Sequence, residues 1–78
     1  MTSAISWREV LFDLHCVGLP PRAVFREIQG AISLSMLRSY GRGTAEPSHV
    51  RGELILDLWC EKTGKRREDA PRRPLRRP

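Results

Sequence analysis

Residues 31–40, with the sequence AISLSMLRSY, carry the clearest local signals of a short helix. Ser33 can accept a hydrogen bond from a free backbone amide in the first turn of a helix, and serine is favoured at such N-cap positions. Leu37 and Tyr40, three residues apart, lie on the same side of the helix that follows. We therefore expect a short helix over residues 34–40, capped by Ser33 and buried on one side.

A second short helix is expected just before this stretch. Pro21 suits a first helical turn, where its missing amide would have had no partner and its fixed φ is already helical. The helix is expected to run to about Gln29, and the pair Gly30-Ala31 then interrupts the pattern. Its buried side is formed by Ala23, Val24, Phe25 and Ile28, with Arg22 and Arg26 on its outer face.

An amphipathic first helix precedes this pair. Ser6 and Glu9 form a capping box, in which each side chain bonds the other residue's backbone amide. Gly18 ends the helix, because glycine adopts the left-handed conformation of that position without strain. Apolar residues recur at i, i+3, i+4 and i+7: Trp7, Val10, Leu11 and Leu14.

A fourth helix is expected from Ser48 to Lys62 or Thr63, with Gly64 as its stop. One apolar stripe contains Val50, Leu54, Ile55, Leu58 and Trp59. Leu56 and Cys60 lie outside that stripe, so the helix has more apolar surface than one neighbour would cover. The surplus predicts a second partner, and we assign it to Leu56, Trp59 and Cys60.

The residues after Gly64 show no periodicity. Residues 65–78 contain seven Lys or Arg and two acidic residues, interleaved with three prolines. This composition predicts a disordered, Arg/Pro-rich tail. The tail carries the whole net charge of +5, so residues 1–64, expected to form one domain, are neutral overall. Within that domain residues 20–43 are basic and the segments on either side are acidic, a distribution that favours an approach by nucleic acid to the middle segment.

Residues 31–40 resemble the turn and recognition helix of the lambda-repressor-like family of phage and plasmid regulators, whose pattern is G-V-S-x-x-T-[VI]-S-x-W. In that comparison Ile32, Leu37 and Tyr40 take the buried positions and Ala31 replaces the usual glycine. The resemblance covers about residues 6–64. It departs from the family at the small alanine of the preceding helix, which falls on Glu27, or on Phe25 if the turn contains one extra residue.

The resemblance implies an all-α, four-helix (five at most) helix-turn-helix domain that binds double-stranded DNA as a transcriptional regulator, most readily a repressor of phage or mobile-element type. Its DNA-binding residues would be Arg22, Ser33, Leu34, Ser35, Arg38, Ser39 and Arg42. Arg38 is placed for a bidentate contact with guanine, and Arg22 for a phosphate. Each arginine has an alternative reading as an ordinary solvated side chain.

Such domains reach useful specificity as two-fold dimers. Leu56, Trp59 and Cys60 are the expected homodimer interface, although the same residues could instead complete a monomeric core. A small helical module that binds another protein through the same fold is the alternative function. An RNA-binding adaptor led by the tail is a further alternative.

Other classes of function find little support. His15, Cys16, His49 and Cys60 have no recognised metal-ligand spacing, and the adjacent pair points about 100° apart on a helix. No nucleophile–base pair or carboxylate pair indicates an enzyme, so we expect no cofactor and no small-molecule substrate. No apolar run reaches the ~20 residues of a membrane span, and two isolated cysteines are typical of a reduced, cytoplasmic protein.

Overall fold

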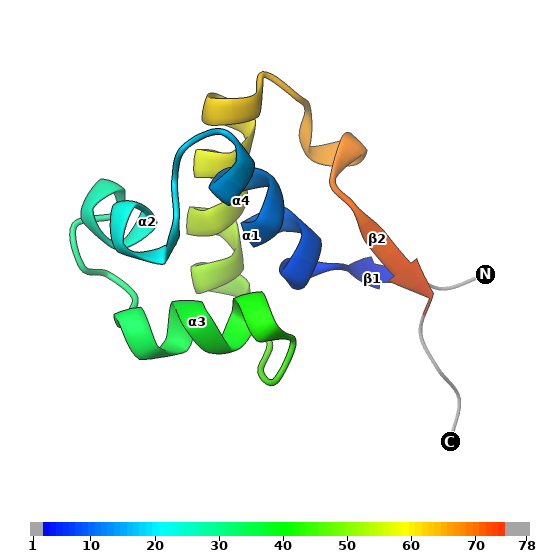
Figure 1. The fold of residues 1–78 in the computed structure, drawn as a ribbon. Coiled ribbons are helices and arrows are strands. Elements are labelled where there is room, and N and C mark those ends of the chain that lie inside the picture. Colours follow the sequence, from blue (N-terminus) through cyan, green and yellow to red (C-terminus); the bar gives the residue numbers. More distant parts are fainter. Residues whose placement is uncertain (1–2, 75–78) are drawn as a thin grey trace.

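Four helices wrap around a small core, and two short strands lie beside them (Figure 1). The computed structural model describes residues 3–74 of the 78-residue chain. The elements in chain order are β1 (Ser3–Ile5), α1 (Trp7–Cys16), α2 (Pro21–Glu27), α3 (Leu34–Arg42), α4 (His49–Thr63), the 3-10 turn η1 (Arg67–Asp69) and β2 (Arg72–Pro74). The predicted helical class is thus confirmed, with a two-stranded antiparallel sheet added to it.

The ends of α1 follow the local signals. The Ser6 hydroxyl accepts a hydrogen bond from the Glu9 amide at 3.4 Å. The Ser6 amide donates to the Pro71 carbonyl rather than to the Glu9 carboxylate, so only one of the two bonds of the predicted capping box forms. At the other end Gly18 has φ +95°, and its amide donates to the His15 carbonyl while the Leu19 amide donates to the Leu14 carbonyl. This pair of bonds is a Schellman motif, which satisfies the carbonyls left free at a helix end.

The turn between α2 and α3 is longer than expected, because α2 ends at Glu27 rather than near Gln29. Gln29 and Gly30 both have positive φ, +55° and +73°, and this reverses the chain. The Phe25 ring packs on Gly30, 3.4 Å from the position that a Cβ would occupy. Glu27 is exposed and pairs with Lys62 of α4, so Phe25 rather than Glu27 occupies the contact with the turn.

The caps of α3 and α4 confirm the predicted starts. Ser33 accepts a hydrogen bond from the Met36 amide at 3.2 Å, and Ser48 accepts one from the Arg51 amide at 3.4 Å. Helix α3 continues through Gly41 to Arg42, two residues further than expected, before Gly43 ends it with φ +79°. Gly64, with φ +73°, ends α4 as predicted.

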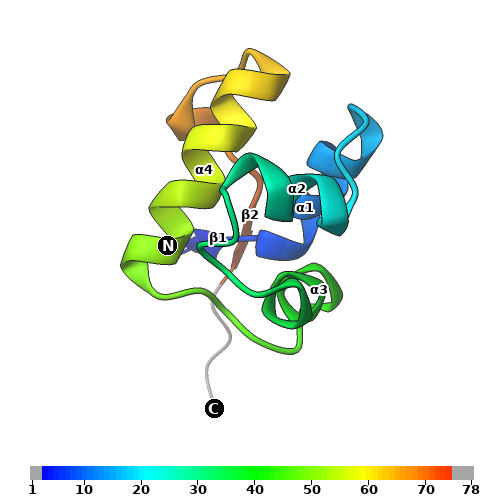
Figure 2. The same ribbon diagram turned by 90° about the vertical axis from the view of Figure 1, so that its left-hand side faces the viewer.

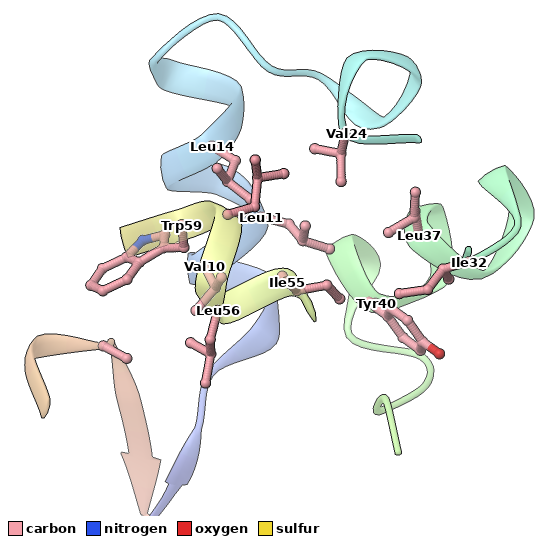
Figure 3. Close-up of a cluster of buried hydrophobic side chains, with 12 residues drawn as sticks. Val10, Leu11, Leu14, Val24, Ile32, Leu37, Tyr40, Ile55, Leu56 and Trp59 are labelled. Carbon is pink, nitrogen blue, oxygen red and sulfur yellow. The ribbon is translucent and has the colours of Figure 1, made fainter. Parts of the chain in front are cut away.

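The core joins all four helices (Figure 3). Val10, Leu11 and Leu14 of α1 lie between α4 and the α2–α3 pair. The indole of Trp59, fully buried on α4, donates a hydrogen bond to the Asp13 carboxylate at 3.1 Å. The remaining buried apolar residues are Val24, Ile32, Leu37, Tyr40, Ile55, Leu56, Leu58 and Ala70.

The buried face of α4 differs from the predicted stripe. Val50 and Leu54 were expected inside but are 70% and 36% exposed, whereas Leu56, expected outside the stripe, is only 7% exposed. Trp59 is fully buried, as its place in the stripe predicted. Cys60 is half-buried against the same core. Leu56, Trp59 and Cys60 therefore complete the core of a single chain and do not form the free surface that the predicted dimer interface requires. The second partner of α4 is the chain's own segment after Gly64.

That segment is folded as far as Pro74, which corrects the prediction of a disordered tail starting at residue 65. Strand β2 pairs antiparallel with β1, with Ser3 opposite Pro74 and Ile5 opposite Arg72. The Ser6 amide donates to the Pro71 carbonyl at 2.8 Å, and Ala70 is buried. The part of the predicted tail at residues 75–78 lies outside the described residues. Among residues 3–74, none of the helices has the length and apolar character of a membrane span.

Candidate nucleic-acid interface

The outer face of α3 carries most of the predicted DNA-binding residues. Helix α3 lies at an edge of the molecule in both views, and its buried side chains Leu37 and Tyr40 point into the core (Figures 1, 2 and 3). At about 100° per residue, the other positions fall within an arc of roughly 140° that faces away from the core. These positions are Leu34, Ser35, Arg38, Ser39 and Arg42.

Ser35, Arg38 and Arg42 are exposed, whereas Leu34 and Ser39 are half-buried. The apolar surface expected at Leu34 is thus smaller than the sequence suggested. Ser33 is exposed, but its hydroxyl already accepts the bond from Met36 that caps α3. Ser33 is therefore the N-cap of α3, and it has this structural role whether or not a ligand binds.

The arginines near α3 have no acidic partner among the described residues. No salt bridge within residues 3–74 involves Arg8, Arg22, Arg26, Arg38 or Arg42. Arg22 is exposed on the first turn of α2, and no hydrogen bond or salt bridge connects it to α3. The structure thus brings five predicted residues together on α3 and leaves Arg22 on a separate helix.

Arginines of the C-terminal segment are engaged by acidic residues. Arg67 bonds both Glu53 and Asp57 of α4, Arg73 bonds Glu46, and Arg66 lies near Asp69. Although desolvation lowers the pKa of Arg67, its hydrogen bond to Asp57 and the charges of Glu53 and Asp57 raise that pKa above its ordinary value. The bonds of Arg67 and Arg73 fix the segment to the body of the protein, and they pair two of its arginines with carboxylates.

A groove of about 480 Å³ runs between α1 and α3. Leu11, Leu37 and Gly41 line it, and the ring of Phe12 stands in it with 65% of its surface exposed. This groove was not predicted from the sequence. The signal was present, because Phe12 lies outside the stripe of apolar residues that α1 buries.

The two cysteines are free: Cys16 is exposed and Cys60 is half-buried. Within the part of the chain that the structure describes, no group of three His, Cys, Asp or Glu side chains lies close enough to hold a metal ion.

Comparisons of the chain with protein-family models, with curated proteins and with solved structures found no match.

Proposed function

We propose that the protein is a sequence-specific DNA-binding regulator of transcription, with α2 and α3 as a helix-turn-helix of the lambda-repressor-like kind. The observation that carries the proposal is the outer face of α3. It combines exposed arginines, which have no acidic partner within residues 3–74, and small hydroxyl side chains on a short, capped helix at the edge of the molecule.

The distribution of charge supports the proposal further. The acidic residues Glu53 and Asp57 of α4 form salt bridges with Arg67, and Glu61 forms one with Lys62. DNA phosphates attract the arginines of α3 and α2, which have no salt bridge within residues 3–74, more strongly than they attract the paired charges of α4. This difference favours an approach with α3 toward the duplex.

In this proposal α3 enters the major groove, which is wide enough for a helix. Arg38 donates two hydrogen bonds to the O6 and N7 atoms of a guanine, while Leu34 packs on a thymine methyl group. Ser35 and Ser39 bond base edges or phosphates. Arg42 and Arg22, at the ends of the surface, bind phosphates and fix the position of α3 along the groove.

A domain of this size buries little DNA surface by itself, so we propose that two copies bind two half-sites. The residues first assigned to the dimer contact are buried within one chain. Val50 and Leu54, exposed four residues apart on α4, are available for such a contact instead.

The test is selection of binding sites from a randomised duplex-DNA pool at about 150 mM salt, with the full chain. The whole chain is needed because residues up to Pro74 belong to the fold. We expect an inverted repeat to be enriched, with half-sites about one helical turn apart, and with affinity that falls steeply as salt increases.

Absence of any enriched sequence would refute the proposal. Binding that is blind to sequence and unchanged by the substitution Arg38→Ala would refute the assignment of α3. In that case the alternative, a helical module that binds another protein, would take its place.

A further inference from the structure

At five of the six glycines, the backbone conformation or a close neighbour explains why the residue has no side chain. Gly41 is the exception. Four glycines have a positive φ: Gly18, Gly30, Gly43 and Gly64. At Gly52 a Cβ would lie 2.9 Å from the Trp7 ring, so a larger residue does not fit. Gly41 has ordinary helical geometry, and a Cβ there would lie 3.8 Å from Leu11, an ordinary van der Waals contact.

A glycine inside a helix is less favourable than alanine by about 1 kcal/mol. Gly41 lies on the floor of the groove between α1 and α3, where the missing side chain allows a close approach from outside. A ligand in the groove would account for a glycine at this position, since a Cβ here would make only an ordinary van der Waals contact with Leu11.

The walls of the groove indicate what such a ligand contains. Phe12 offers a rigid aromatic surface at 65% exposure, and aromatic anchors of this kind dominate the energetics of protein interfaces. Arg8, Phe12 and His15 follow one side of α1 over about 10 Å, roughly two helical turns. The groove is open along this length, so it suits an extended or helical segment better than a small molecule, which binding sites usually enclose.

The rim of the groove is basic. Arg8, Arg38 and Arg42 border it without a salt-bridge partner among the described residues, against one carboxylate, that of Glu9. Charge complementarity therefore calls for acidic residues beside the apolar ones of the ligand.

We propose that this groove binds an acidic amphipathic helix of another protein. Its apolar side chains lie between Phe12 and Gly41, and its carboxylates face Arg8, Arg38 and Arg42. Helices that bind in grooves use apolar residues at i, i+3 or i+4 and i+7 in this way. Because Arg38 and Arg42 also belong to the proposed DNA-binding face, the bound helix excludes DNA; this last step rests on the proposed function.

The probe is a displayed library of 16-residue helical peptides, randomised on one face and selected against the full chain. Enriched peptides are then measured by fluorescence anisotropy against wild type, Phe12→Ser and Gly41→Leu. We expect peptides with two apolar residues four apart and at least two acidic residues, and a loss of affinity of at least tenfold in both variants. Circular dichroism checks that the variants fold, and Val17→Ser, which replaces an exposed apolar residue at the end of α1 outside the groove, is the matched control and should bind as wild type does.

Three results would overturn the assignment of the groove: no enriched peptide, enriched peptides without acidic residues, or groove variants that bind the peptides as tightly as wild type does. Self-association of the wild-type chain that Phe12→Ser abolishes would also overturn it, by assigning the groove to a second copy. Displacement of the bound peptide by the selected DNA tests competition. If peptides bind but no DNA sequence is enriched, the groove assignment stands and only the exclusion of DNA falls.

Discussion

Arg38 is the residue on which the proposed reading of DNA depends most. It is exposed, lies in the middle of α3, and has no salt-bridge partner within residues 3–74. A bidentate contact with guanine contributes about 1–3 kcal/mol of discrimination, so Arg38→Ala should weaken binding to the selected site by about 5- to 150-fold and relax specificity at one base pair. Electrophoretic mobility shifts with the selected site and its single-base variants measure both effects.

The matched control is Arg66→Ala. Arg66 is also an exposed arginine, but it belongs to the segment that follows α4, and this segment starts at the end of α4 away from α3 (Figure 1). Its loss should lower affinity equally for all sequences and by much less. Equal effects of the two substitutions would show that Arg38 contributes charge alone.

The two helical glycines, Gly41 and Gly52, give opposite predictions for stability. In Gly52→Ala the new methyl group would lie 2.9 Å from Trp7, and such overpacking costs about 1–3 kcal/mol, more than alanine gains in helix propensity. In Gly41→Ala the methyl group fits, so the free energy of unfolding should rise by about 0.5–1 kcal/mol. Urea denaturation of both variants measures the difference, and a destabilised Gly41→Ala protein would mean that the chain itself requires this glycine.

At the scale of the element, Ser33 allows capping and DNA binding to be separated. Because its hydroxyl caps α3, Ser33→Ala should lower the free energy of unfolding by about 1 kcal/mol. Ser33→Asp retains a capping acceptor and should restore stability, but its negative charge beside the DNA should lower affinity. Thermal denaturation and DNA titration of the two variants provide the test. Full DNA affinity in Ser33→Asp would place the start of α3 away from the phosphates.

The helices could be predicted because their ends are encoded locally. Ser6, Ser33 and Ser48 each accept a bond from an amide three residues ahead, and Gly18 and Gly64 adopt positive φ at the stops. Such signals depend only on residues close to each helix end, so they can be recognised without knowing how the rest of the chain folds. The same locality explains why Ser35, Arg38 and Arg42 could be placed on the exposed face of α3.

Burial on α4 could not be predicted in this way, because apolar residues surround most of that helix. Whether Val50 or Leu56 is buried depends on the segment that covers the helix, and this segment follows Gly64. Strand β2 contains Arg72, Arg73 and Pro74, residues without the alternating apolar pattern of a strand. Its pairing with β1 joins the two ends of the chain, a non-local contact that residues 65–78 do not reveal. The groove beside Phe12 could not be predicted for the same reason, because it is formed by the packing of α1 against α3.

At the scale of the whole molecule, the segment after Gly64 should contribute to stability. Removal of residues 65–78 deletes β2, exposes the core beside Ala70 and breaks the bonds of Arg67 with α4. We expect the free energy of unfolding to fall by at least ~1 kcal/mol and Tm by at least ~4–8 °C. Differential scanning calorimetry measures this loss.

The control for this deletion ends the chain after Pro74, which preserves the pairing of β2 with β1. That shorter deletion should leave Tm close to the wild-type value. If both truncated chains unfold at the wild-type temperature, the strands contribute nothing to stability.

The pairing of Ser3 with Pro74 makes the backbone nearly a closed ring, with its seam at the β1–β2 sheet, across the molecule from α2 (Figure 1). A short linker across this seam would join the two ends without moving a helix. The loop at residues 43–48, between α3 and α4, would then serve as a new start for a circularly permuted chain. The order of the helices along the polypeptide is therefore one of several that the same packing would accept.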